Sequence, residues 1–536
     1  MNNETKPKAE DGDDLLGNPA DLVSQKAPPG VNRRSFVMRS AVVGAAAIMT
    51  GKSLLAADRT YEAVKSLPVM RPSSGLYVHM AKGPIIITAD EFYKVGPGPS
   101  SSHTIGPMRI TYDFYQRCTK LPADKLAKAT ALRVNLFGSL SSTGKGHGTE
   151  RATLAGLIGM EPATVDPLFL DGLRDKPDQT FKVKLGGKEI PVSLKDVIYD
   201  APKGDFHHQN TMVCHLLAGN EDLYSLEYYS VGGGFIEWKG YTPPKKNAPK
   251  YPFESMKELR AHADKNKLSI GQVMLANEMS IAGKTEEEIN AFIDKIINAM
   301  LATVKSGLSM PDAVLPGPIK LHSKAATVYK RAMDEQNAAD RGIGLLSACA
   351  IAASEENARG HLVITAPTGG SAGVMPSLVY GLMEGRNISR EKVREGMLAA
   401  LAVGYLCKHH ATLAAAEGGC QAEIGVASAM AAALVATAHG AEARVVENAA
   451  ESALEHHLGM TCDPVAGYVQ VPCIERCAFG AVKAWTAYAI ASNEVASSHR
   501  VTLDETVMAL AQTAKDMNSK YKETSEAGLA LSVVLC

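Results

Sequence analysis

The stretch from residue 391 to 440 constrains the fold most, because its helical segments have almost no polar face. It reads "EKVREGMLAALAVGYLCKHHATLAAAEGGC" over 391–420 and "AEIGVASAMAAALVATAHG" over 422–440. A helix that is apolar on all sides has to be buried on all sides. Residues 253–536 are therefore predicted to form an all-helical domain around a central buried helix.

The first half of the chain has a different pattern. Between residues 78 and 240, short β-branched or apolar runs such as "PIIITADEFY", "LRVNLFGSL" and "FKVKL" alternate with Gly/Pro-rich turns. This alternation predicts an α/β domain, and "YTPPKKNAPKYP" at 241–252 is the predicted linker. A chain of 536 residues is too long for one core. The predicted fold class is α+β, an α/β domain followed by the helical domain.

The N-terminus is predicted to contain two segments. Residues 1–30 are polar and acidic, which predicts a disordered tail. Residues 31–60 hold Arg33, Arg34 and a short apolar run from Ala41 to Met49, and resemble a twin-arginine export signal. Export to the periplasm is the expectation, with a first amphipathic helix of a cytoplasmic protein as the alternative. The run is shorter than the roughly 20 residues that span a bilayer, so no stable membrane anchor is expected.

Composition narrows the possible functions. The net charge of -1 argues against a nucleic-acid partner, which normally selects a basic excess. The nine cysteines lie too far apart for a secreted disulfide framework. None forms the CxxC pair of a zinc ribbon.

Two Gly-rich loops carry groups suited to chemistry. In "GPGPSSSHTIGPMRI" (96–110), three serines, His103 and Thr104 precede a predicted helix. Such a loop suits an anion, and His103 can exchange a proton near neutral pH; a capping turn is the alternative. In "GSLSSTGKGHGTERA" (138–152), Lys145 and His147 lie among glycines. The Walker pattern does not fit, so the prediction is an anion-binding turn facing a shared cleft.

A third turn follows an apolar, strand-like run in "ITAPTGGSAGVMPSL" (364–378). The backbone N–H groups of Gly369, Gly370 and Ser371 are candidates for binding a carboxylate. The alternative is an ordinary helix start, capped by Thr368 or Ser371.

Three cysteines lie at breaks between helical segments: Cys420 after two glycines, Cys462 before Asp-Pro, and Cys473 after Pro472. Breaks allow thiols to project into a cleft, and converging thiolates without histidine ligands favour an iron–sulfur cluster over zinc. From spacing alone, three buried hydrophobes remain the alternative.

At these residues the chain resembles a known family, the iron–sulfur-dependent L-serine dehydratases in their single-chain form. Seven ordered blocks over roughly 78–536 carry the resemblance: "GPSSSHTIGPM", "GSL…TGKGHGT", "YYSVGGGFI", "APT-G-AGV-P", "EGGCQAEIG", "TCDPVAGYVQVPCIER" and "KYKETSEAGLA". The resemblance implies a [4Fe–4S] cluster held by Cys420, Cys462 and Cys473. It implies that the open iron is a Lewis acid, and that L-serine becomes pyruvate and ammonia without pyridoxal phosphate.

The resemblance also assigns roles to individual residues. His103 matches the candidate acid/base, with Lys145 and His147 lining the interdomain cleft. Substrate carboxylate and amine would be held by Ser100, Ser101, Ser102, Thr104, Thr368, Gly369, Gly370 and Ser371. Cys536, at the end of "LSVVLC", would cap the open iron as a resting fourth ligand. The family also implies a homodimer.

Two positions depart from the family pattern. Gly369 and Cys477 stand where the family usually has Asn. The chain therefore lacks two side-chain amides that the family usually has near the site. This leaves two alternative functions open, an iron–sulfur lyase for L-cysteine or L-threonine and a non-catalytic amino-acid-binding or cluster protein. It also leaves open a role for Cys477 as a further cluster ligand.

Overall fold

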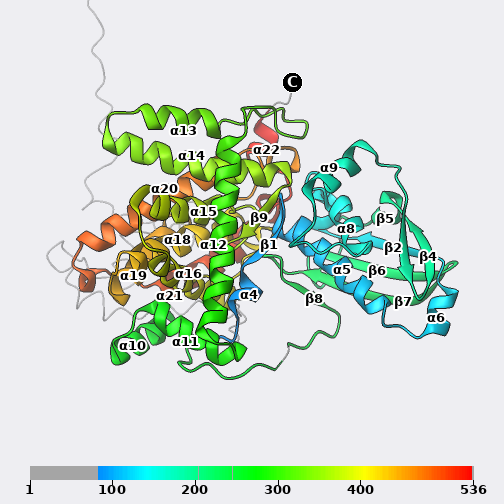
Figure 1. Ribbon diagram of the computed structural model, residues 1–536, viewed down its shortest axis with the longest axis horizontal. Coiled ribbons are helices and arrows are strands. Elements are labelled where there is room, and N and C mark those ends of the chain that lie inside the picture. Colours follow the sequence, from blue (N-terminus) through cyan, green and yellow to red (C-terminus); the bar gives the residue numbers. More distant parts are fainter. Residues whose placement is uncertain (1–82, 203, 244, 534–536) are drawn as a thin grey trace, which may run out of the picture. The chain divides into compact units, whose positions relative to one another are not determined.

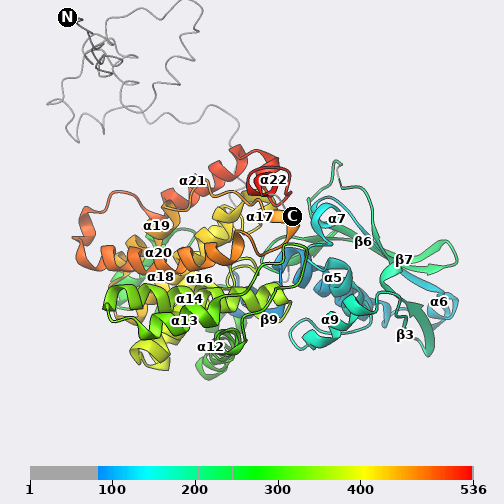
Figure 2. The ribbon, with the colours of Figure 1, turned by 90° about the horizontal axis from the view of Figure 1, so that it is seen from above.

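A computed structural model of the chain describes residues 83–202, 204–243 and 245–533. The predicted acidic tail, the twin-arginine segment and Cys536 lie outside the described residues. The described residues belong to one compact unit, with an α/β part and a helical part (Figures 1 and 2).

A five-stranded sheet forms the centre of the α/β part, in the order β5-β2-β6-β7-β8. Its β2–β5 pair is parallel and its other pairs are antiparallel. Side chains of β2 alternate between buried and more exposed positions, and those of Val134 and Leu136 pack with residues of α5 and α8. The strands are β2 (Ala131–Leu136), the β3–β4 hairpin (Phe181–Leu185, Lys188–Val192), β5 (Val197–Tyr199), β6 (Thr211–Ala218), β7 (Glu221–Ser230) and β8 (Ile236–Trp238).

The helices of the α/β part give this sheet one covered face. The main ones are α5 (Gly106–Cys118) and α8 (Thr149–Leu157), and the shorter ones are α6 (Ala123–Lys128), α7 (Ser139–Thr143) and α9 (Pro167–Asp175).

The helical part confirms the predicted central helix. Every residue of α18 (Ile424–Ala438) is buried, against α15 (Val374–Tyr380), α16 (Arg390–His410), α19 (Ala443–Glu455) and α20 (Cys473–Asn493). Among the described residues, the segment Cys420–Ala438 is the one stretch long and apolar enough to cross a membrane, and it is entirely buried within the protein. The other helices are α10 (Met256–Asn266), α11 (Ile270–Ala282), α12 (Glu286–Ser309), α13 (Ala325–Asp334), α14 (Ala338–Arg359), α17 (Ala415–Gly418), α21 (Leu503–Asp516) and α22 (Leu529–Ser532).

A two-stranded sheet joins the two parts. Strand β1 (Lys94–Pro97) pairs antiparallel with β9 (Leu362–Thr365) of the helical part, and α4 (Ala89–Phe92) packs into the helical core. The α/β core therefore begins after β1, and the helical part contains one strand. The antiparallel pairing puts the end of β1 beside the start of β9. The serine-rich loop after β1 folds back from there onto the 366–371 turn, where a Cβ at Gly369 would lie 2.7 Å from the Ser101 N.

Candidate active site

The three predicted cysteines converge in the helical part, two of them at helix starts and the third in a loop. Cys420 lies in the short turn before α18, Cys462 in the loop after α19, and Cys473 at the first position of α20. Helix N-termini favour negative charge, and this lowers the cost of a thiolate there. All three line one small cavity, named here the inner cavity, together with Ser100, His147, Gly370, Glu423, Ile424, Pro464, Val469 and Glu523.

The inner cavity contains more groups that can carry a negative charge than groups that carry a positive one. A hydrogen bond from Cys462 lowers the pKa of Cys420 to about 7, with help from Arg476, whose Nη1 lies 3.3 Å from the Cys420 sulfur. The same hydrogen bond raises the pKa of Cys462, and burial raises that of Cys473. The thiols thus hold only one negative charge readily, because Arg476 is the one cation that contacts them in the described part of the chain.

Two buried carboxyl groups share this cavity, and the sequence analysis did not single them out. The carboxylate of Glu423 lies within 4.8 Å of the Cys420 and Cys462 sulfurs. Burial raises the pKa of Glu423 and raises that of Glu523 to about 8, and the Cys420 charge adds to both shifts. Both residues lie inside quoted blocks, Glu423 three positions after Cys420 and Glu523 in "KYKETSEAGLA". The signal in the sequence that could have identified them is the presence of an acidic residue in the cysteine-bearing block "EGGCQAEIG" and another in the C-terminal block "KYKETSEAGLA".

The C-terminal segment around Glu523 is held against the Cys462 loop by its backbone. Cys462 N–H donates to the Tyr521 carbonyl and Glu523 N–H donates to the Cys462 carbonyl, each at 2.8 Å. Glu523 adopts a left-handed backbone with φ of 58°, a conformation uncommon for a non-glycine residue. Further along, Leu529 N–H donates to Asp463 Oδ2 at 2.7 Å. This segment therefore places a carboxylate beside the thiols from a distant part of the sequence.

His103 lies 3.7 Å from Glu523 Oε1 through its Nδ1, and both of its ring nitrogens have a hydroxyl partner. Its Nδ1 is 2.8 Å from the Ser102 hydroxyl and its Nε2 is 3.0 Å from the Ser139 hydroxyl. Burial, followed by the neighbouring His147, lowers its pKa well below the usual value. His103 is completely buried and does not line the inner cavity.

His147, in contrast, presents a free nitrogen to the inner cavity. Its Nδ1 lies 3.0 Å from the Thr143 carbonyl. A carbonyl can only accept, so Nδ1 carries the proton and Nε2 keeps its lone pair. Nε2 has no hydrogen-bond partner among the described residues and lies 3.8 Å from Glu523 Oε1. Burial lowers the pKa of His147 to about 4, which keeps the ring neutral.

The two histidine loops are fastened to each other. Thr104 donates to the His147 carbonyl at 2.8 Å, and Thr149 donates to the His103 carbonyl at 2.6 Å. The rings lie 4.6 Å apart between centroids. Thr104 therefore acts on loop geometry, and the Ser100 hydroxyl caps the turn by accepting from His103 N–H at 3.1 Å.

The 368–371 turn packs directly against the serine loop. Thr368 and Ser371 hydrogen-bond each other, and Thr368 also bonds to Glu423. A Cβ at Gly369 would lie 2.7 Å from the Ser101 N, so this packing has no space for the side chain usual at this position. Gly370 lines the inner cavity.

Cys477 lies one helical turn after Cys473. Its thiol lies 3.3 Å from the Gly370 carbonyl, and burial raises its pKa to about 11. The residue does not line the inner cavity, and this arrangement favours a hydrogen-bonding role over a ligand role.

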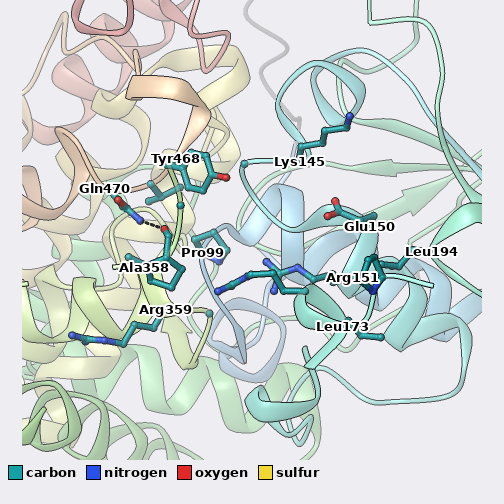
Figure 3. Close-up of a pocket in the computed structure, with 17 residues that line it drawn as sticks. Pro99, Lys145, Glu150, Arg151, Leu173, Leu194, Ala358, Arg359, Tyr468 and Gln470 are labelled. Carbon is teal, nitrogen blue, oxygen red and sulfur yellow. Dashed lines mark hydrogen bonds between the residues drawn. The ribbon is translucent and has the colours of Figure 1, made fainter. Parts of the chain in front are cut away.

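Lys145 faces away from the thiols. Its Nζ lies 5.5 Å from the centre of the Tyr199 ring, and it lines a second cavity of about 270 Å³, named here the outer cavity. Figure 3 shows Lys145, Glu150 and Arg151 of the α/β part on one side, facing Tyr468, Gln470 and Arg359 of the helical part, with Pro99 between them.

The donor set of the inner cavity fits an iron–sulfur cluster. The inner cavity holds only about 10 Å³, and the Cys420 and Cys462 thiols that line it are hydrogen-bonded to each other. Three thiols and two carboxyls packed together with one arginine make a site that favours a cationic centre, and sulfur donors select iron–sulfur clusters or other soft metals.

An α/β part that contributes histidines, and a helical part that contributes clustered thiols, define a two-part protein with one shared buried site. A family model described as the serine dehydratase beta chain matches residues 88–241, and one described as the serine dehydratase alpha chain matches residues 265–530. This chain belongs to the serine dehydratase family, in the form that joins both parts in one polypeptide.

Similar proteins cover most of the chain. An L-serine dehydratase of Haemophilus influenzae is 37% identical over 459 residues, which are 84% of this chain and 100% of that protein. L-serine dehydratase TdcG of Escherichia coli is 40% identical over 466 residues, with the same coverage. An L-serine dehydratase of Streptomyces coelicolor is 38% identical over 459 residues, again with the same coverage.

Proposed function

We propose that the chain is an L-serine ammonia-lyase that converts L-serine to pyruvate and ammonia with a [4Fe–4S] cluster. One observation carries the proposal: Cys420, Cys462 and Cys473 line one cavity with the unpartnered Nε2 of His147. When bound, the cluster would supply a Lewis-acidic iron that eases departure of the substrate hydroxyl.

The protein's own groups then divide the remaining work. His147 Nε2, neutral and unprotonated, is the group that accepts the Cα proton. It is a better base than His103 in this arrangement, because both ring nitrogens of His103 are already engaged with serine hydroxyls. His103 orients the neighbouring loop through Ser102 and Ser139. Loss of the proton and the hydroxyl leaves aminoacrylate, and water then releases ammonia and pyruvate.

Glu523 is proposed to meet the substrate's ammonium group. Its Oε2 is buried without a hydrogen-bond partner among the described residues. Burial raises the pKa of Glu523 to about 8, so an ammonium group beside it would stabilise the ionised carboxylate. The substrate carboxylate would lie toward Ser100 and the 368–371 turn, whose N–H groups are the available donors.

Three expectations from the sequence remain part of the proposal. Cys536 is proposed as the resting fourth ligand; Leu529, seven residues earlier, is bonded to Asp463 beside Cys462, so the tail starts near the site. Export through Arg33 and Arg34 is proposed on the segment's pattern alone. A homodimer is proposed from the family resemblance, and sedimentation of the purified protein would test it.

An anaerobic assay tests the central proposal. Protein reconstituted with iron and sulfide should contain about four irons per chain and form pyruvate from L-serine without added pyridoxal phosphate. L-Cysteine and L-threonine serve as competing substrates. A fully loaded protein that binds L-serine and forms no pyruvate would contradict the lyase and favour a binding protein.

A further inference from the structure

The outer cavity adjoins the inner cavity across a wall one residue thick. Along two chain segments, neighbouring residues face opposite cavities: Pro99 the outer and Ser100 the inner, Gly146 the outer and His147 the inner. Val469 lines both cavities. The thiols themselves are buried, so a substrate needs a route through the protein, and this wall is the thinnest partition between the two cavities.

The wall has a seam between the two parts of the protein. A Cβ at Gly146 would lie 2.7 Å from the Gly467 carbonyl, so the α/β loop and the helical part touch there through backbone alone. Val469 follows two residues later and supplies the side chain that closes the gap. A small shift of the 145–148 loop or of Val469 would join the cavities.

Arg151 has a longer ion pair than the other arginines of the outer cavity. Arg359 is paired with Glu356 at 3.0 Å and with Glu355 at 3.9 Å. Arg151 lies 3.9 Å from Asp171, which Arg174 contacts more closely at 3.2 Å, and the charge of neighbouring Glu150 also acts on Arg151. The direct ion pair of Arg151 is therefore long and shared.

Arg151 is also placed to receive a ligand. Its Nη1 donates to the Leu170 carbonyl at 3.1 Å, which anchors the side chain and leaves other N–H groups for a planar acceptor. Its side chain is 17% exposed, and Figure 3 shows it near the middle of the cavity. Burial and the Arg174 charge lower its pKa, against the opposing effect of the Glu150 and Asp171 charges.

We propose that the outer cavity is a docking site for small carboxylic acids, in which Arg151 binds the carboxylate of an amino acid entering, or a 2-oxo acid leaving, past Val469. The proposal rests on the proposed lyase function for the identity of these acids. The guanidinium fork binds the carboxylate through paired hydrogen bonds, and the low exposure of the site strengthens the attraction. Capture in the outer cavity is then separate from chemistry in the inner one.

The test compares Arg151→Gln with Asp171→Asn in the reconstituted holoenzyme. Arg151→Gln should lower kcat/KM for L-serine about tenfold at low salt, leave kcat unchanged and flatten the salt dependence. Asp171→Asn should raise kcat/KM, since it frees Arg151. Lys182→Gln removes the same charge from an exposed strand position and should change nothing. Unaltered kcat/KM in Arg151→Gln would overturn the proposal.

A second variant separates docking from passage. Val469→Phe fills the partition, so turnover should be lost while the iron content stays that of the wild type. Calorimetric titration with sodium pyruvate should still detect binding to Val469→Phe and no binding to Arg151→Gln. Equal pyruvate binding by both variants would overturn the docking site. Failure of the wild type to form pyruvate would instead refute the lyase, and the titration would still judge the outer cavity.

Discussion

The inner cavity is lined by three thiols, two carboxyls and one histidine, whereas the charged groups that line the outer cavity are three arginines, a lysine and one glutamate. The inner cavity holds about 10 Å³ and the outer about 270 Å³. Burial perturbs nearly every inner titratable group, while most outer charges are paired near the surface. The contrast teaches that proton transfer and charge separation need exclusion of water, while capture of a charged solute needs room and a reachable cation.

Loss of an inner thiol should produce the largest effect. Cys462→Ser should abolish cluster retention and reduce pyruvate formation to background, because two remaining thiols cannot hold the cluster. Iron analysis and the anaerobic assay provide the measurement. Cys407→Ser, a buried cysteine in α16 outside the inner cavity, is the control and should retain iron. Full activity in Cys462→Ser would remove the chemical role of the inner cavity.

The two histidines should differ strongly in their contribution. His147→Asn keeps a donor near the Thr143 carbonyl but removes Nε2, and should lower kcat by about 10²–10⁴ with normal iron content. His103→Asn should cost less, because both nitrogens of that ring are engaged with serines. The comparison is made from kcat at saturating L-serine. A larger loss of kcat in His103→Asn than in His147→Asn would show that His103 is the catalytic base.

Replacement of Glu523 should change recognition of the amino group. Glu523→Gln is expected to raise the dissociation constant for L-serine about 10- to 100-fold, the cost of one hydrogen bond to a charged group. Binding of L-glycerate, which has a hydroxyl where L-serine has the amine, should change little. Calorimetry on holoenzyme gives both constants. If the dissociation constants of both ligands rose equally, Glu523 would support the shape of the cavity and would not bind the ammonium group.

The smallest effect is expected at the tail. Cys536→Ser should shorten the lag before steady turnover and increase oxygen sensitivity, with unchanged cluster content, because a resting ligand is lost. Progress curves begun with and without air exposure give the measurement. An identical lag in the variant and the wild type would contradict a ligand role for Cys536.

Much of this architecture could be predicted from local pattern. The apolar run at 422–440 has one physical solution, a helix covered on all sides, and α18 adopts it. The three cysteines could be picked out because each lies at a break between helical segments, and such breaks are encoded by nearby glycine and proline residues. The resemblance to serine dehydratases rested on contiguous blocks of the same kind.

Tertiary structure alone decided how groups far apart in the sequence meet. The sequence favoured His103 as the acid/base and placed His147 only in the cleft lining. The contacts with Ser102, Ser139 and Thr143 are what distinguish the saturated ring of His103 from the His147 ring. Glu523 enters the site through backbone pairing with Cys462, and Arg151 has only a long ion pair to Asp171, which Arg174 shares. Whether a side chain's hydrogen bonds and charge are satisfied depends on all of its neighbours in space. Helical burial, in contrast, follows from the periodicity of one segment. This is why the sequence determined the helices and the fold determined the chemistry.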